Sequence, residues 1–343
     1  MRPKYQFSII INNNLTNNSA ASKAVLDCRS LFSYKGYEDF SIYVPDSSNK
    51  AKYFTSILNQ LFKVFIRIDK RALIGVQYPI LNNVFKYFIK LAKLKSASIF
   101  CIIHDIETLR LGGKDKLQVS KEISNLNYYD CLIVHNDIML RWLKERGVST
   151  KMISLNLFDY LIRDCTLINN SDQLTYSIAF AGNLSKSTFI YKLEEIKHWH
   201  FNVFGPNYLQ EKPAQKNVRW MGEFKPDEVV FELKGSFGLI WDGESINECD
   251  EVLGNYLKYN NPHKFSLYLA AGLPVIAPEN AAIALFIKQY EVGILIKNLK
   301  DLESLNISGN EYLRLRENCK KLQKQVAEGF FFTQALEKVE NTI

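Results

Sequence analysis

The chain has 343 residues, about twice the size of a typical domain, so two domains of similar size with separate cores are expected. Hydrophobic residues make up 47% and charged residues 23% of the chain, which excludes a collagen-like or mainly disordered protein. The formal net charge is +7 at pH 7, and residues 50–95 carry ten Lys and Arg against one acidic residue, Asp69.

Aromatic side chains alternate with the cations of residues 50–95, for example Phe54, Phe62 and Tyr87. The pattern fits two amphipathic helices with solvated Lys faces. It also fits helices that rest on an anionic membrane surface or on an acidic partner. Peripheral membrane contact therefore stays open. No run approaches the ~20 apolar residues of a membrane span, and the apolar run at 7–11 is too short for a secretion signal.

The six cysteines are far apart in the sequence and form no C-x-x-C pair: Cys28, Cys101, Cys131, Cys165, Cys249 and Cys319. This spacing does not indicate a zinc or dithiol site. We expect reduced thiols in the cores of a cytoplasmic protein, with no metal site and no nucleic-acid partner.

The first half repeats one unit, an apolar and β-branched run followed by a polar turn and a helical pattern. The predicted strands are 7–11, 40–44, 73–77, 99–104, 131–135 and 152–155. The predicted helices are 19–33, 50–65, 82–95, 114–126 and 137–145. This alternation specifies a parallel sheet wrapped by helices, so residues 1–158 are expected to form a Rossmann-like domain.

The second half repeats the pattern, and residues 159–322 are expected to form a second Rossmann-like domain. Its predicted strands are 177–181, 202–204, 237–241, 274–276 and 293–296. The remaining residues, 323–343, form a helical tail in which 329–333 separates one helix ending near 327 from a last helix at 334–340. The Phe330-Phe331-Phe332 triplet needs a partner surface, so the tail either crosses back to the first domain or forms an oligomer contact.

Residues 260–277 combine a polar helix start, an apolar helix, a glycine stop and a short buried strand. Pro262 suits the first helical turn, and Gly272 suits the left-handed residue that ends a helix. This order places His263 and Lys264 at the positively polarised N-terminus of a helix, where a phosphate can bind.

Ligands of doubly wound sheets bind beyond the carboxyl ends of the strands, so the residues that follow each strand are candidates. In the second half they are Gly182, Asn183, Lys186, Gly205, Tyr208, Asp242, Ala281, Ala282 and Ile283. Lys186 and Lys264 would supply two cations for a diphosphate. Residues 281–283 have small side chains at a predicted helix start, which would leave their amides accessible to an anion or a sugar oxygen.

In the first half, His104 and Asp105 follow a buried strand, and there they fit either a base for an acceptor hydroxyl or a structural hydrogen bond. The polar loop before the first helix, with Ser19, Ala21 and Ser22, fits either contact with the acceptor or donor phosphates or simple helix capping. Asp159 fits either an interdomain hinge or an acceptor contact. No G-x-G-x-x-G follows the first strand of either half, which argues against a dehydrogenase.

Three segments of the second half resemble the donor-binding half of GT-B glycosyltransferases: Phe180-Ala181-Gly182-Asn183-Leu184, Pro262-His263-Lys264 with Ala270-Ala271-Gly272-Leu273-Pro274-Val275-Ile276, and Val292-Gly293-Ile294. The first half adds Gln77-Tyr78-Pro79, His104-Asp105-Ile106-Glu107 and the loop of residues 12–23. Together these segments resemble a narrower group, the bacterial glucosyltransferases that extend GlcNAc on serine-rich repeat adhesins, with their galactofuranosyltransferase-like relatives.

The resemblance implies an α/β GT-B fold, with two Rossmann-like domains facing each other across a cleft. It implies a UDP-sugar held by the C-terminal domain, an acceptor approached from the N-terminal domain, and no cofactor or obligatory metal. It places Lys186 and Lys264 at the donor diphosphate. The chain departs from the E-x7-E pattern of many retaining enzymes, because Tyr259 and Leu267 stand at those positions. Retention or inversion therefore stays open.

The first hypothesis is an enzyme that transfers a hexose, glucose from UDP-glucose, to GlcNAc on a Ser/Thr-rich glycoprotein before export. An alternative is a galactofuranosyl- or other hexosyltransferase that acts on a lipid-linked glycan at the inner face of the membrane. A third, of another class, is a non-catalytic adaptor subunit, against which the retained Lys186 and Lys264 argue. The resemblance and the Phe triplet favour a homo-oligomer, either a dimer or a tetramer.

Overall fold

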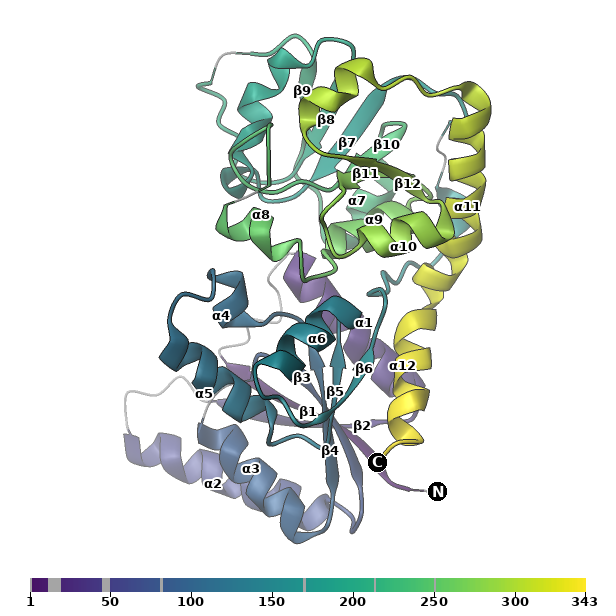
Figure 1. The fold of residues 1–343 in the computed structure, drawn as a ribbon. Helices are drawn as coiled ribbons and strands as arrows, with labels where there is room; N and C mark the ends of the chain where they lie inside the picture. Colours follow the sequence, from purple (N-terminus) through teal and green to yellow (C-terminus); the bar gives the residue numbers. More distant parts are fainter. Residues whose placement is uncertain are drawn as a thin grey trace.

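The computed structural model of the chain describes residues 2–11, 20–44, 50–80, 83–168, 171–212, 214–249 and 251–343. The described residues form two α/β domains that lie one above the other in Figure 1, each built on a six-stranded sheet. The strands pair in parallel throughout both sheets. This is the GT-B arrangement of two Rossmann-like domains that the sequence predicts.

The sheet of the N-terminal domain has the strand order β2-β1-β3-β4-β5-β6. Its strands are β1 (Lys4–Ile11), β2 (Glu38–Val44), β3 (Leu73–Tyr78), β4 (Ser98–Ile103), β5 (Cys131–Val134) and β6 (Lys151–Ser154). Its helices are α1 (Ala20–Tyr34), α2 (Lys50–Arg67), α3 (Asn83–Leu94), α4 (Glu107–Arg110), α5 (Lys116–Leu126) and α6 (Asp137–Glu145). The strand order reverses between β1 and β3, which is where such sheets open a binding crevice.

The sheet of the C-terminal domain has the order β12-β11-β10-β7-β8-β9, the strand order of dinucleotide-binding folds. Its strands are β7 (Ser177–Ala181), β8 (His200–Phe204), β9 (Val218–Gly222), β10 (Phe237–Leu239), β11 (Val275–Pro278) and β12 (Gly293–Ile296). Its helices are α7 (Pro226–Glu232), α8 (Val252–Tyr256), α9 (His263–Ala270), α10 (Ala284–Tyr290) and α11 (Gly309–Glu328). The order reverses between β7 and β10.

Two features differ from the sequence prediction. The edge strand β9 was not predicted, because its apolar run is short and the charged Arg219 interrupts it. The last helix, α12 (Phe330–Glu340), begins directly after Gly329 and not at residue 334. Gly329 has a φ of 81° and ends α11 in the left-handed conformation, so one residue makes the break and the Phe triplet is helical.

Helix α12 leaves the C-terminal domain and packs against α1 and β6 of the N-terminal domain (Figure 1). Phe332 is buried, and its ring meets that of Phe32 edge-on at 5.1 Å between centroids. Leu336 and Val339 join the same hydrophobic cluster. Of the two alternatives for the tail, the structure shows the crossing back.

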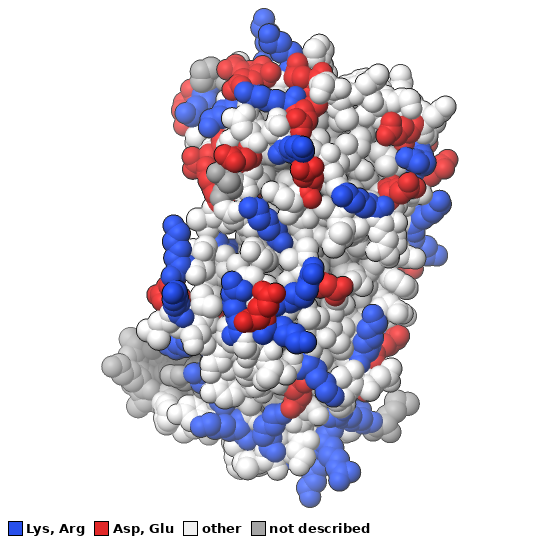
Figure 2. Space-filling model, in the orientation of Figure 1, with Lys and Arg blue, Asp and Glu red and all other residues white. Residues whose placement is uncertain are grey.

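Lys and Arg dominate the lower end of the face drawn in Figure 2, where the N-terminal domain lies, whereas both signs of charge mix over the C-terminal domain. The six cysteines carry free thiols, and five of them are buried. Among the described residues, no helix combines the length and the apolar character needed to cross a membrane.

Candidate active site

A cavity of about 520 Å³ lies between the two domains. Its floor is formed by the switch point of the N-terminal sheet, with residues of β1 and the end of β3, and residues 260–263 of the C-terminal domain close it from the other side. His104 and Asp105, which follow β4, line the cavity together with His263. The structure therefore brings the predicted first-half candidates and the start of α9 into one space.

Lys264 lies in the first turn of α9, and its ammonium reaches the end of β10. Nζ donates to Oδ1 of Asp242 at 2.7 Å and to the carbonyl oxygen of Trp241 at 3.2 Å. It also lies 4.8 Å from the ring centroid of Phe180 on β7. An ammonium has three N–H donors, so one remains for a ligand at the β7/β10 switch point. Lys264 and Asp242, both predicted as donor-site residues, are in direct contact.

Helix α9 has this position because its buried face packs closely on β7 and β10. The hydroxyl of Tyr268 accepts a hydrogen bond from the Ala181 amide at 2.9 Å. Gly238 on β10 leaves room for the ring, since a Cβ there would lie 2.2 Å from it. A bulkier residue at position 238 would lift the helix, and Lys264 with it, off the sheet.

Two glycines bring the ends of β7 and β8 together. Gly205 has a φ of 135°, and a Cβ there would lie 1.9 Å from the Gly182 carbonyl oxygen. Asn183, which follows Gly182, is exposed at this edge. Its Oδ1 accepts from Asn207 at 3.1 Å and from the Ser185 hydroxyl at 2.8 Å. The Asn183 Nδ2 group faces no described partner and can meet a hydroxyl.

The remaining donor-site candidates differ in how firmly they are held. Tyr208 stacks on Trp220 at 5.7 Å and 4° between the ring planes, which fixes an aromatic surface beside Gly205. Lys186 is exposed at the end of a 3-10 turn, and none of the ion pairs among the described residues involves it. Lys264 is thus an anchored cation and Lys186 an adaptable one.

The sequence predicts accessible amides at residues 281–283, and the structure corrects this prediction. The Ala281 amide donates to Pro278 and the Ala282 amide donates to Leu257, at 3.1 and 2.8 Å. All three residues are buried, Ile283 included, and α10 begins only at Ala284. The turn after β11 therefore uses the Ala281 amide and the end of α8 uses the Ala282 amide, so neither is available to an anion.

Three histidines surround the ring of Phe158 at the cavity. His104 Nε2 donates to Oε1 of Gln77 at 2.7 Å, and His135 Nε2 donates to the His104 carbonyl oxygen at 2.9 Å. Burial lowers the pKa of His104 to about 3 and those of His135 and His263 to about 4. All three are neutral at pH 7. So low a pKa makes His104 a weak base, which favours its structural interpretation.

His263 stacks on Tyr160 at 5.0 Å, and its Nε2 lies 3.3 Å from the Asp159 carbonyl oxygen. His263, the first residue of α9, is thus fixed to the interdomain linker, and it directly precedes Lys264.

Asp105 is the acidic residue among those that line the interdomain cavity. Its Oδ2 accepts a hydrogen bond from Nη1 of Arg110 at 3.0 Å. Arg110 lines the same cavity but was not predicted, because a single Arg five residues after Asp105 forms no motif that indicates a binding site. The pair sets a cation beside a carboxylate that could accept a proton from an acceptor hydroxyl.

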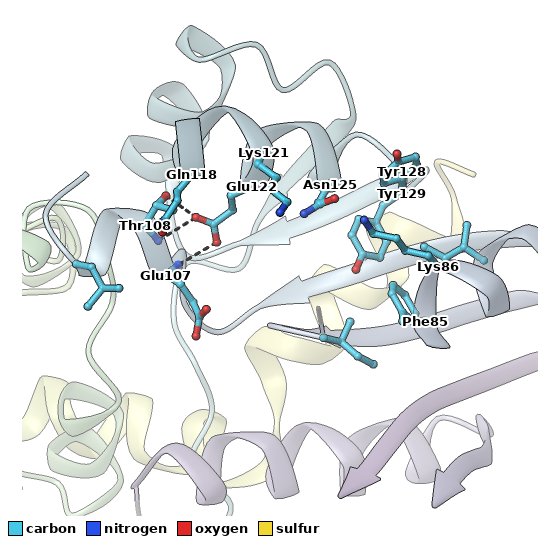
Figure 3. A pocket seen from close by; sticks show the side chains of 13 residues that line it. Phe85, Lys86, Glu107, Thr108, Gln118, Lys121, Glu122, Asn125, Tyr128 and Tyr129 are labelled. Atoms are coloured by element: carbon cyan, nitrogen blue, oxygen red, sulfur yellow. Dashed lines mark hydrogen bonds between the residues drawn. The ribbon is translucent and has the colours of Figure 1, made fainter. Parts of the chain in front are cut away.

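A buried glutamate holds the segment that carries this pair. Glu122 on α5 accepts from the amides of Glu107 and Thr108 at 3.0 and 2.9 Å (Figure 3). It also accepts from the hydroxyl of Tyr78 at 2.7 Å. These contacts fix α4 to the end of β3. They also form one wall of a second cavity, of about 480 Å³, which shares Ile80 with the first.

Asn261 ties the two domains together and was also not predicted. It is buried, and its Nδ2 donates to the carbonyl oxygens of His135 and Asn156 at 2.8 and 2.7 Å. Its Oδ1 accepts from Asn136 at 2.7 Å. The residue before Pro262 thus locks the start of α9 onto the N-terminal domain, a role that one asparagine in a polar stretch does not reveal.

The acceptor-loop candidates are only partly described. Ser19 lies outside the described residues, as do most of the preceding loop and the side chain of Ala21, while Ser22 lies in the first turn of α1. The next residue, Lys23, is buried and reaches Asp27 at 2.5 Å and Asp227 of the C-terminal domain at 3.0 Å. The start of α1 is therefore held against the C-terminal domain.

Asp159 is buried at the linker, and both carboxylate oxygens are used. They accept from the amides of Phe331 and Phe332 at 3.2 and 2.7 Å. Burial raises the pKa of Asp159 to about 8. These contacts favour the hinge interpretation over an acceptor contact.

We expect Asp159→Asn to flatten the pH dependence of stability. The native Asp159 keeps a proton that the unfolded chain, with its pKa of about 3.8, has already released, so the free energy of unfolding falls as pH rises from about 4 to about 8. Relative to the variant, the wild type should lose on the order of 2–4 kcal/mol between pH 5 and 8. Urea unfolding at several pH values measures this. Parallel curves for both proteins would contradict it.

Two facing Rossmann-like domains with their binding crevices at the switch points define the GT-B fold. A glycosyltransferase from Rickettsia africae ESF-5 has the same fold, with a TM-score of 0.56 and 11% identity over 99% of this chain and 98% of that one. An alpha-glucosyltransferase in complex with UDP has a TM-score of 0.54 and 11% identity, over 98% of this chain and 99% of that one.

Two family models match the sequence and give the narrower assignment. The model described as "Glucosyltransferase 3-like, N-terminal domain" matches residues 8–157, and its C-terminal counterpart matches residues 178–339. The chain belongs to the Glucosyltransferase 3-like family.

Relatives of two activities match the chain. Beta-1,6-galactofuranosyltransferase WbbI of Escherichia coli K12 is 32% identical over 255 residues, 72% of either chain. Glucosyltransferase 3 of Streptococcus gordonii is 25% identical over 94% of this chain and 96% of its own. Both are hexosyltransferases by name, and they differ in the sugar named.

Proposed function

We propose that the chain transfers a hexose from a UDP-sugar, with UDP-glucose as donor and GlcNAc on a Ser/Thr-rich glycoprotein as acceptor. The observation that carries the proposal is the Lys264–Asp242 contact at the β7/β10 switch point, the place where such folds bind the diphosphate of a nucleotide. The match to Glucosyltransferase 3 along almost the whole chain supports glucose as the sugar.

The chemistry follows from the charge that develops on the departing UDP. As the glycosidic bond breaks, negative charge accumulates on the terminal phosphate, and cations that are already in place stabilise it without reorganisation. Lys264 has three N–H donors and two hydrogen-bond acceptors in the protein, and exposed Lys186 can approach from the β7 side. One anchored and one adaptable cation can provide this stabilisation without a metal. Among the described residues, no group of three or more metal-ligating side chains occurs.

On the acceptor side, the cavity presents Gln77, Asp105 and Arg110 from the N-terminal domain. Amide, carboxylate and guanidinium groups together can hold the hydroxyls of a sugar acceptor. Asp105 is the candidate for taking the proton from the attacking hydroxyl, because the low pKa of His104 makes that imidazole a poor base.

The first test is binding of UDP to the full chain. At a UDP concentration about 100-fold above Kd, the native state gains about 2.7 kcal/mol, which should raise the Tm by roughly 5–10 °C. Thermal unfolding with and without UDP measures this, with AMP as the control nucleotide. A folded chain that shows no shift at millimolar UDP would refute the donor assignment.

A second candidate differs in donor and acceptor and is favoured by the 32% identity to the galactofuranosyltransferase WbbI. It is transfer of galactofuranose or another hexose to a lipid-linked glycan. Release of UDP from a panel of UDP-sugars, each offered with a GlcNAc glycoside, separates the two by donor preference. Turnover by the isolated chain would also exclude the adaptor hypothesis.

A further inference from the structure

Helix α2 has two lines of apolar residues, one buried and one exposed. Ile57, Leu61, Val64 and Ile68 follow helical spacing into the core of the N-terminal domain, the last of them one residue beyond the helix. A second line on the outer face is Phe54, Leu58, Phe62 and Ile66, each about half to two-thirds exposed. Residues four apart share one side of a helix, so this second line is a continuous apolar stripe in solvent.

Helix α3 lies beside α2 and continues the same surface (Figure 1). Its core face is buried, whereas Tyr87 and Leu94 are exposed at 59% and 76%. Exposed lysines accompany the apolar side chains on both helices, namely Lys52, Lys63, Lys86, Lys90 and Lys93. We call these exposed residues of α2 and α3 the α2/α3 face.

The α2/α3 face is strongly and almost purely basic. From residue 50 to 95 the chain carries ten Lys and Arg and one acidic residue. Within the described part, Arg67 pairs with Glu38 and Lys93 with Asp130, and Lys63, Lys86 and Lys90 have no described acidic partner. Figure 2 shows the same excess of Lys and Arg at this end of the molecule.

We propose that the α2/α3 face docks on a membrane surface that contains anionic lipid. A helix with Phe and Leu on its outer face and Lys beside them can bury the apolar side chains at the headgroup boundary while each cation meets lipid charge. A second copy of the chain is the poorer occupant, because a symmetric contact would place the same uncompensated lysines against one another.

The position of the α2/α3 face connects docking to the cavities. Phe85 and Ile89 of α3 line the second cavity, while Tyr87 and Leu94 of the same helix point to solvent. Ile80 lines both the second cavity and the interdomain cavity. Lys86 belongs to the α2/α3 face and also lines the second cavity, so a membrane on this face would lie at the edge of that cavity.

The test is flotation of the full-length protein with vesicles of phosphatidylcholine alone or mixed with phosphatidylglycerol, with no nucleotide or acceptor present. We expect binding to the mixed vesicles only, weakened by added salt. Phe62→Ser with Ile66→Ser, and separately Lys63→Glu with Lys90→Glu, should each lower the vesicle partition coefficient about ten-fold or more.

Matched controls carry equivalent changes on the C-terminal domain. These are Leu167→Ser with Leu313→Ser for the stripe, and Lys216→Glu with Lys321→Glu for the charge, and both should bind as the wild type does. All four leave the site untouched, and a cooperative thermal unfolding transition without nucleotide, close to that of the wild type, shows that the variants are folded. Absent binding by the wild type, or equal loss in the controls, would overturn the proposal. So would a dimer that dissociates on Phe62→Ser without any vesicle binding.

Because membrane binding is measured without donor or acceptor, its outcome is independent of the proposed transferase reaction. A chain that transfers hexose but does not float would refute the docking surface alone.

Discussion

Replacing Lys264 by Ala is expected to lower kcat/KM for hexose transfer by about 100-fold or more, because one preorganised donor to a developing oxyanion contributes about 10²–10³ in rate. Its ammonium is held by Asp242 and the Trp241 carbonyl, so it needs no rearrangement when charge develops on UDP. The fold should persist. Asp242 is partly exposed, with 23% of its side chain accessible, so water can solvate the carboxylate that loses its partner.

Initial rates of UDP release with and without acceptor measure the effect, and thermal unfolding confirms that the variant is folded. The matched control is Lys288→Ala, which removes an exposed lysine of α10 in the same domain. Wild-type kcat/KM in folded Lys264→Ala would contradict the assignment, as would an equal loss in the Lys288 variant. The UDP-dependent shift in Tm should also shrink in Lys264→Ala and remain in the control.

Replacing Gly205 by Ala is expected to destabilise the C-terminal domain by about 4 kcal/mol or more. The added Cβ would lie 1.9 Å from the Gly182 carbonyl oxygen, and neither of the two backbone segments is a flexible side-chain end that can move aside. The positive φ of 135° adds strain for any residue with a Cβ. Because the clash separates the ends of β7 and β8, UDP binding should fall as well.

The control for Gly205→Ala is Gly147→Ala. Gly147 also has a positive φ, 95°, but a Cβ there meets nothing within 4 Å. The control therefore carries backbone strain without the clash, and it should cost about 1–2 kcal/mol. Urea unfolding of both variants separates the two contributions. Equal destabilisation would show that the contact between Gly205 and Gly182 has no energetic weight of its own.

Much of the fold could be predicted because each strand of a parallel sheet is a short apolar run with a helix on either side. The same logic located the donor-site candidates, since strand ends in such a sheet share one edge. Lys264 and Asp242 are 22 positions apart, and both come from strand-end or helix-start rules. Edge strand β9 was missed because the charged Arg219 interrupts its short apolar run.

The residues that escaped prediction act through contacts between distant segments. Asn261 matters because it meets His135 and Asn156 across the domain boundary. Glu122 matters because two backbone amides and two hydroxyls donate to it. Neither contact leaves a local pattern. The amides of Ala281 and Ala282 were misjudged because small side chains suggested an open backbone, whereas Ala281 donates to Pro278 within the turn and Ala282 donates to Leu257.

The return of α12 to the N-terminal domain has a consequence for synthesis. Phe332, Leu336 and Val339 complete a hydrophobic cluster that otherwise consists of N-terminal residues such as Phe32 and Phe100. Because α12 follows the whole C-terminal domain in the chain, it is synthesised last. Until then, the apolar surface that α12 covers on the N-terminal domain is exposed. The first domain to be made is thus the last to be finished, and a fragment that ends at the linker would aggregate through this open face.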